Sequence, residues 1–225
     1  MRVCVLYSGG KDSNLAFLKA YNSGLKIACL ISLIPSSEES VLFHYPNMNM
    51  VKLQAQALGL PLICEECPND EEGSIKALFE VLKRAKEEYS VEGVVTGAIR
   101  SIYQASRFQR VCWKLKLWCF NPLWLKDEIS LLNEIINYEF EVIFTRVAGY
   151  PLKKSLLGRR ITKEVVNYLS KIKNFVNPSG EGGEYETLVL DMPLFRKRIE
   201  IIKYEIIGED YDATLLIKEA KLVEK

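Results

Sequence analysis

Histidine is nearly absent from this chain, with one in 225 residues, and neither charge sign is in excess, with 30 Lys and Arg against 29 Asp and Glu. Proteins that bind nucleic acid by neutralising many phosphates usually carry a basic excess, so tRNA is not an expected partner. The chain also lacks an apolar run of about 18 residues, which argues against a membrane-spanning helix, and we expect no membrane partner.

Cysteines are few for a secreted disulfide framework and are spread over positions 4, 29, 64, 67, 112 and 119. The first residues enter a strand-like segment rather than a signal peptide. With 48% apolar and 26% charged residues, the composition is that of a globular protein. We therefore expect a cytoplasmic protein with reduced thiols.

Strand-like and helical segments alternate over the first half of the chain. Strands are predicted at 3–7, 27–34, 61–64, 93–97 and 118–120, and helices at 13–21, 48–58, 75–89 and 103–115. Repeated βα units form parallel sheets covered by helices. The expected fold class is α/β, with a Rossmann-like parallel sheet, helices on both faces, and ligands beyond the carboxyl ends of the strands.

The regular alternation of strands and helices ends after Trp124. Helices are predicted at 127–138 and 163–173, and strands at 142–147, 187–190, 198–207 and 214–220. No long helix separates the last two strands, which favours an antiparallel pair. We expect a domain over 1–126 and a smaller α+β domain over 127–225.

The loop Ser8-Gly9-Gly10-Lys11-Asp12-Ser13, between the first strand and the first helix, is the strongest candidate for chemistry. Its glycines can take positive φ and let a ligand approach the backbone. Consecutive N–H groups and the helix start would then cradle a phosphate, with a point charge from Lys11 and hydroxyls from Ser8 and Ser13. The alternative is a glycine turn with a capping Asp or Ser.

This loop resembles the PP-loop of the N-type ATP pyrophosphatases. These enzymes have a HUP-type fold and cleave ATP between the α and β phosphates. Segments in order along the whole chain resemble the diphthine–ammonia ligase family: His44–Asn47, Leu53–Gly59, Gly97–Ala98 with Tyr103, Gln104, Arg107 and Arg110, Pro122–Trp124, and Gly180–Thr187. The resemblance implies an ATP-binding domain at 1–126 and a substrate-binding domain at 127–225. It implies amidation of the diphthine carboxylate of translation elongation factor 2 by ammonium, releasing AMP and pyrophosphate.

Activating a carboxylate for amidation favours an acyl-adenylate, with catalysis from positioning and charge stabilisation. The expected catalytic residues are Lys11, Asp12, Arg107 and Arg110, and the expected ATP-binding residues are Ser8, Gly9, Gly10, Lys11, Asp12, Ser13, Ser32, His44 and Gly97. Mg²⁺ would bridge phosphate oxygens and Asp12, although Asp12 could instead only cap the helix. His44 is interpreted as a hydrogen-bond donor near adenine, the alternative being a structural or surface role.

Arg107 and Arg110 lie one helical turn apart and suit the α-phosphate or the substrate carboxylate, with a solvated helix face as the alternative. Tyr103, Gln104, Trp124, Glu181, Glu184 and Glu186 are the expected substrate-binding residues. Glutamates among glycines suit a metal or a cation, with a charged surface turn as the alternative. The family's substrate carries a quaternary ammonium group, which we expect Glu184 or Glu186 to receive with Tyr103, Trp124 or Tyr185.

Cys64-Glu65-Glu66-Cys67 has the spacing of a redox or half-zinc motif, but no second such pair follows and the surrounding acids should raise the thiol pKa. Surface thiols are the favoured interpretation. The alternatives for the whole chain are a thiolating tRNA-modifying enzyme with the same loop and a nucleotide-binding regulatory module without turnover. The length and the lone histidine favour free ammonium over a glutaminase domain as the nitrogen source. The sequence leaves open whether the chain forms a homo-oligomer.

Overall fold

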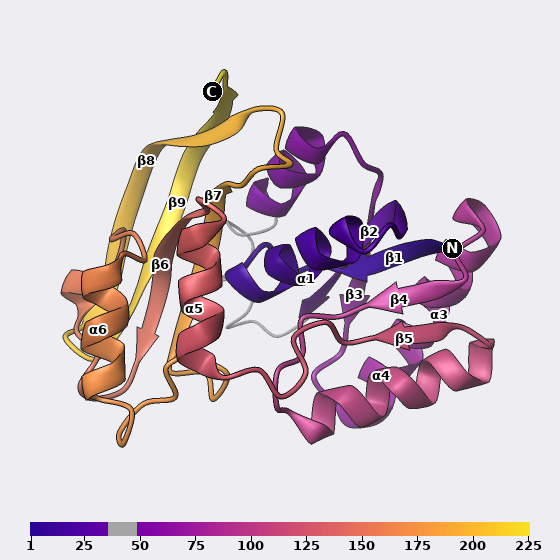
Figure 1. Ribbon diagram of the computed structural model, residues 1–225, viewed down its shortest axis with the longest axis horizontal. Helices are drawn as coiled ribbons and strands as arrows, with labels where there is room; N and C mark the ends of the chain where they lie inside the picture. Colours follow the sequence, from indigo (N-terminus) through magenta and orange to yellow (C-terminus); the bar gives the residue numbers. More distant parts are fainter. Residues whose placement is uncertain (36–48) are drawn as a thin grey trace. The chain divides into compact units, whose positions relative to one another are not determined.

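The computed structural model describes residues 1–35 and 49–225 of the chain (Figure 1). These residues form two compact units. The first holds Met1–Ser8 and Asp12–Trp124, and the second holds Gly9–Lys11 and Leu125–Lys225. The chain thus passes into the second unit and back within the predicted phosphate loop.

The first unit is built on a five-stranded parallel sheet in the order β3-β2-β1-β4-β5. Its strands are β1 (Arg2–Leu6), β2 (Lys26–Pro35), β3 (Leu62–Cys67), β4 (Gly93–Val95) and β5 (Trp118–Phe120), and its helices are α1 (Lys11–Asn22), a helix over 49–58, α3 (Glu71–Tyr89) and α4 (Ile102–Leu115). Figure 1 shows α1 and α4 on opposite faces of the sheet. The predicted Rossmann-like α/β fold is confirmed.

Burial and capping explain these elements. Val3, Cys4 and Val5 of β1 are fully buried, as expected for a central parallel strand covered on both faces. Helix α3 buries Leu78, Val81, Leu82 and Ala85 at helical spacing. The Asp70 side chain caps α3 by accepting the Gly73 N–H, and Ser101 caps α4 in the same way.

The strand order places one position of the sheet where a ligand is expected. The chain runs from β1 outward to β3 and then crosses back to β4, on the other side of β1. Because the crossover reverses there, the carboxyl ends of β1 and β4 form a topological switch point, the usual ligand site of such sheets. The loop after β1 is the predicted phosphate loop.

The second unit contains an antiparallel sheet in the order β7-β6-β9-β8. Its elements are α5 (Glu128–Asn137), β6 (Glu141–Ala148), the 3₁₀ helix η1 (Lys154–Leu156), α6 (Lys163–Lys171), β7 (Tyr185–Asp191), β8 (Arg198–Glu209) and β9 (Asp212–Val223). The predicted smaller α+β part with an antiparallel pair of last strands is therefore confirmed. No helix in the described parts of the chain has both the length and the apolar character to cross a membrane.

Some boundaries differ from the sequence predictions. Strand β3 continues to Cys67 instead of ending near Cys64, because it pairs with β2 as far as Pro35. Helix α3 begins at Glu71, four residues before its predicted start, because the Asp70 cap lies there. The strand predicted at 93–97 ends at Val95, which leaves Gly97 in the loop beyond the sheet.

Candidate functional site

Side-chain contacts in the first unit fix both ends of the predicted phosphate loop. The buried Tyr7 hydroxyl lies 2.5 Å from the Asn14 side-chain oxygen, to which it donates, and joins the end of β1 to the first turn of α1. Burial raises the pKa of Tyr7, so the phenol stays a neutral donor. The Ser8 and Ser13 hydroxyl oxygens lie 3.3 Å apart. The sequence reasoning did not include Tyr7 or Asn14.

Gly97 lies against the backbone of the same loop. A Cβ at this position would lie 3.0 Å from the Asp12 carbonyl carbon and 3.0 Å from the Ser13 nitrogen. A side chain would therefore press on the first turn of α1. The loop after β4 thus approaches the start of α1 at the switch point. Any residue other than glycine at position 97 would require the backbone to move.

Polar side chains follow the neighbouring strands. Thr96, directly after β4, donates its hydroxyl to the Asn121 side-chain oxygen at 2.6 Å and accepts the Ala98 N–H at 3.3 Å. Asn121 follows β5. Ser32, predicted to contact ATP, is buried within β2. Thr96 and Asn121 were missed because single polar residues after short strands carry no motif.

Within the second unit, Gly9–Lys11 bind residues far along the chain. The Gly9 carbonyl accepts the Val189 N–H at 3.1 Å, and the Lys11 N–H donates to the Thr187 hydroxyl oxygen at 3.1 Å. The Lys11 ammonium donates to the Ser179 carbonyl and lies 5.1 Å from the centre of the Tyr185 ring. Lys11 is only 3% exposed, so its charge acts in a medium of low polarity.

Glycines allow the segment Gly180–Thr187 to fold around its own side chains. Gly180 has φ +70°, and a Cβ there would lie 2.8 Å from the Tyr185 ring. A Cβ on Gly182 would lie 2.7 Å from the Glu184 carboxylate. The ring and the carboxylate therefore occupy the space that side chains at these glycines would need.

Only one of the two carboxylate oxygens of Glu184 accepts a hydrogen bond from the described residues. Its Oε1 accepts the Asn177 N–H at 2.9 Å. Its Oε2 is buried and has no hydrogen-bond partner among the residues that the structure describes. A buried carboxylate oxygen without a donor is costly, so Oε2 is suited to a ligand with an N–H or O–H group.

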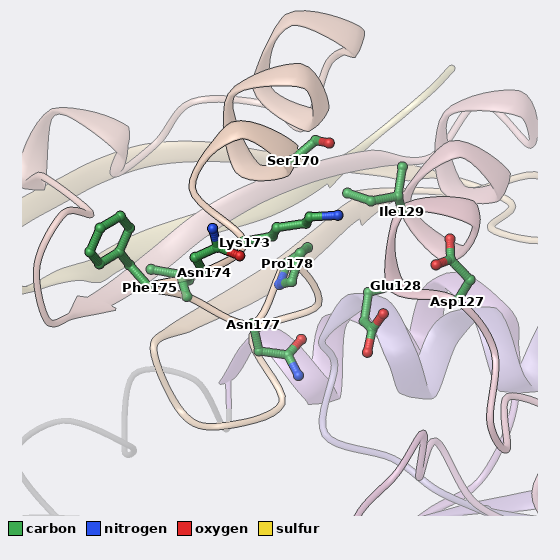
Figure 2. A pocket seen from close by; sticks show the side chains of 10 residues that line it. Asp127, Glu128, Ile129, Ser170, Lys173, Asn174, Phe175, Asn177 and Pro178 are labelled. Carbon is green, nitrogen blue, oxygen red and sulfur yellow. The ribbon is translucent and has the colours of Figure 1, made fainter.

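A cavity of about 490 Å³ lies in the second unit, where α5 begins and the chain leaves α6. Figure 2 shows Asp127 and Glu128 of the α5 start on one side and Asn174 and Asn177 on the other, while Phe175 points away. Asn177 is the residue whose N–H binds Glu184. The cavity and the glutamate segment therefore share a wall.

The predicted arginines differ in environment. Arg107 stacks on Tyr103, with its guanidinium carbon 3.6 Å from the ring centre. Its Nη2 lies 2.7 Å from Glu71 Oε1, which is an ion pair, but the two atoms are not aligned for a hydrogen bond. The Arg107 side chain is 18% exposed. Arg110 and Gln104 are exposed on α4. The structure thus brings Tyr103 and Arg107 together and leaves Arg110 in solvent.

The remaining predicted residues have plainer surroundings. Trp124 is half-buried, as is Glu181. Glu186 is exposed on β7, opposite Arg146 of β6. Tyr185 is buried; its ring lies beside the Lys11 ammonium and packs against the Phe144 ring in a T-shaped arrangement. His44 lies outside the described residues.

Cys64 and Cys67 lie on β3 and are partly buried, so the prediction of surface thiols was wrong in degree, because β3 extends through both cysteines. Residues three apart on a strand point to opposite faces and their Cα atoms are roughly 10 Å apart, too far for a disulfide. Burial is the main cause that raises both pKa values, and Asp70 contributes only at Cys67. Over the described ranges, no group of three His, Cys, Asp or Glu side chains has metal-binding geometry.

Comparison with known families agrees with this architecture. A model described as the diphthamide synthase N-terminal domain matches residues 1–118, and one described as the C-terminal domain matches 127–223. The chain belongs to the diphthine–ammonia ligase family. A diphthine–ammonia ligase of Danio rerio is 36% identical, covering 95% of this chain and 91% of its own length. Ligases of this name from Bos taurus and Homo sapiens are 33% and 32% identical, each covering 95% of this chain and 87% of the relative.

Among solved structures, a predicted subunit of a tRNA methyltransferase from Methanocaldococcus jannaschii is similar to this diphthine–ammonia ligase family member. It covers 86% of this chain and 98% of its own, with a TM-score of 0.39 and 16% identity. A similarity this low does not indicate function.

Proposed function

We propose that the chain is an ATP-dependent ligase that amidates the diphthine carboxylate of translation elongation factor 2 with ammonium, through an acyl-adenylate, releasing AMP and pyrophosphate. The observation that carries the proposal is the glycine-rich loop at the switch point between β1 and β4, in a chain of the diphthine–ammonia ligase family. Residues 1–126 would bind ATP, and 127–225 would bind the protein substrate.

The loop fits a polyphosphate. Gly9 has φ +81°, a conformation that opens the backbone to a ligand, and Gly97 leaves the α1 start uncovered by a side chain. The positive end of α1 favours an anion there. The Lys11 N–H already donates to Thr187, so the remaining loop amides and the Lys11 ammonium would carry the phosphate contacts.

Asp12 is the protein ligand proposed for Mg²⁺. It is half-buried in the first turn of α1. One carboxylate suffices for Mg²⁺, which usually takes its other ligands from water and phosphate oxygens. When bound, the ion would neutralise charge on the phosphates.

Arg107 is the residue proposed to meet the substrate carboxylate or the α-phosphate. Stacking on Tyr103 fixes the orientation of the guanidinium plane, and the nearby Glu71 carboxylate balances the positive charge of Arg107. The Glu71 carboxylate makes no directed hydrogen bond to Arg107. A substrate carboxylate or phosphate can therefore displace it, because a guanidinium binds two oxygens of such a group in parallel. The exposed Arg110 would contribute charge only.

Two glutamates are proposed for the two cationic groups of the reaction. Glu184 Oε2 is a buried acceptor without a donor, which suits ammonium and its N–H groups. A quaternary ammonium group has no N–H, so it gains nothing from a directed acceptor and needs only accessible negative charge. Glu186 is exposed and supplies that charge. Trp124 and Gln104, both in the first unit, stay predicted contacts of the protein substrate.

The proposed function is tested by incubating the chain with ATP, Mg²⁺, ammonium and elongation factor 2 that carries diphthine. The expected result is AMP and a mass change of the factor equal to replacing OH by NH₂. AMP formed only with tRNA would favour a tRNA-modifying enzyme, and binding of ATP without AMP would favour a regulatory module. The cytoplasmic location stays a prediction.

A further inference from the structure

Three aromatic side chains contact one another at the surface of the second unit. Tyr150 meets Phe175 with ring centres 6.4 Å apart, and Tyr211 with ring centres 5.4 Å apart. Tyr150 is 67% exposed and Phe175 is 70% exposed. We call these three residues the aromatic patch. Exposed aromatic clusters are typical of protein-binding surfaces, because burying them on binding recovers hydrophobic free energy.

A separate pocket of about 400 Å³ lies between η1 and α6. Buried Leu156 and half-buried Val165 contribute apolar surface, while Lys153 and Arg159 are exposed cations. The full lining is Lys153, Ser155, Leu156, Arg159, Glu164, Val165 and Tyr168, which we call the basic pocket. The pocket thus combines apolar surface with positive charge.

The two cations of the basic pocket differ from their neighbours in sequence. Lys154 pairs with Asp210 at 3.5 Å, and Arg160 pairs with Glu141 at 2.5 Å. Within the described parts of the chain, Lys153 and Arg159 have no acidic side chain at ion-pair distance. Their charges are therefore available to an incoming anion.

Glu164 is the carboxylate of the basic pocket, and its charge is already stabilised locally. The Thr162 hydroxyl binds it and lowers its pKa, with a smaller contribution from Lys163. It also lies in the first turn of α6, where the helix favours negative charge. With two cations against one carboxylate, the pocket keeps a net positive charge.

The loop after β6 joins the aromatic patch to the basic pocket and to the candidate site. Tyr168 of the pocket donates its hydroxyl to the carbonyl of Pro151, the residue after Tyr150, at 3.1 Å. Ala148, at the end of β6, donates its N–H to the Glu184 carbonyl at 2.8 Å. Both features are therefore built on backbone that also holds the glutamate segment.

We propose that the aromatic patch and the basic pocket form one docking surface for a segment of the protein substrate that carries apolar and acidic side chains. The aromatic patch supplies the apolar anchor, and Lys153 with Arg159 supply the complementary charge. The proposal rests on the proposed function, because it concerns how the protein substrate of that reaction is held. It assigns binding of the protein substrate to residues other than those proposed to bind ATP, Mg²⁺ and ammonium.

The test measures binding of diphthine-bearing elongation factor 2 to the chain without ATP or ammonium, so that it does not depend on amidation. Tyr150→Ala and Arg159→Gln should each raise Kd about tenfold, as for interface residues of this kind. The chain offers matched controls: Tyr204→Ala removes a tyrosine that is 57% exposed on β8, and Arg160→Gln removes the adjacent, paired arginine. Both controls should bind as the unchanged chain does, and thermal unfolding confirms that all four variants fold.

The outcomes separate the two proposals. If Tyr150→Ala and Arg159→Gln bind the factor as tightly as their controls, the docking surface is refuted while the proposed function stands. If the unchanged chain binds the factor but forms no amide with ATP and ammonium, only the proposed function fails. If the two variants lose affinity for tRNA and not for the factor, the surface binds RNA and the proposal is overturned.

Discussion

Gly97→Ala is the substitution that tests the phosphate loop most specifically. The added methyl would lie 3.0 Å from two backbone atoms of Asp12 and Ser13, whereas carbon atoms in ordinary contact are about 3.5–4.0 Å apart. The start of α1 or the loop after β4 must therefore move by a few tenths of an ångström. Overpacking of this kind costs about 1–3 kcal/mol, and each kcal/mol lowers Tm by about 2–4 °C in a chain of this size.

The effect on ATP should exceed the effect on stability. A shift of the loop misplaces the groups that hold the phosphates, so the KM for ATP should rise roughly tenfold or more. Gly24→Ala is the matched control, because Gly24 has φ +81° beyond the other end of α1 and a Cβ there would meet nothing within 4 Å. Its backbone strain costs about 1–2 kcal/mol without touching the loop. Equal KM values for ATP in the two variants, at comparable Tm, would refute the assignment of Gly97 to the ATP site.

Three further substitutions test single residues. Lys11→Met should slow AMP formation roughly 10²–10³-fold by removing a phosphate contact, and should also lower Tm because the Ser179 carbonyl loses its donor; unchanged AMP formation would contradict the role of Lys11. Glu184→Gln keeps an acceptor for its backbone partner but replaces Oε2 by an amide, so the KM for ammonium should rise while that for the factor is unchanged. Glu186→Gln should show the opposite pattern, and identical patterns would mean that the two roles are not separate.

The order of the elements could be predicted from the sequence because periodicity and glycine turns are local signals. The loop Ser8–Ser13 could be proposed as a phosphate loop in the same way, since its glycines, lysine and serines are adjacent. The contacts of Lys11 with Ser179 and Thr187 could not be predicted, because the partners lie 168 and 176 residues away and no local pattern encodes such pairing. For the same reason the extension of β3 to Cys67 was missed, since its pairing with β2 decides it.

A single-turnover reaction with ATP, Mg²⁺, ammonium and diphthine-bearing elongation factor 2 decides whether the chain amidates the factor through an acyl-adenylate. We expect AMP, pyrophosphate and amidated factor in equal amounts, with no AMP when the factor is omitted. Release of ADP, or AMP formation without amidation of the factor, would contradict it.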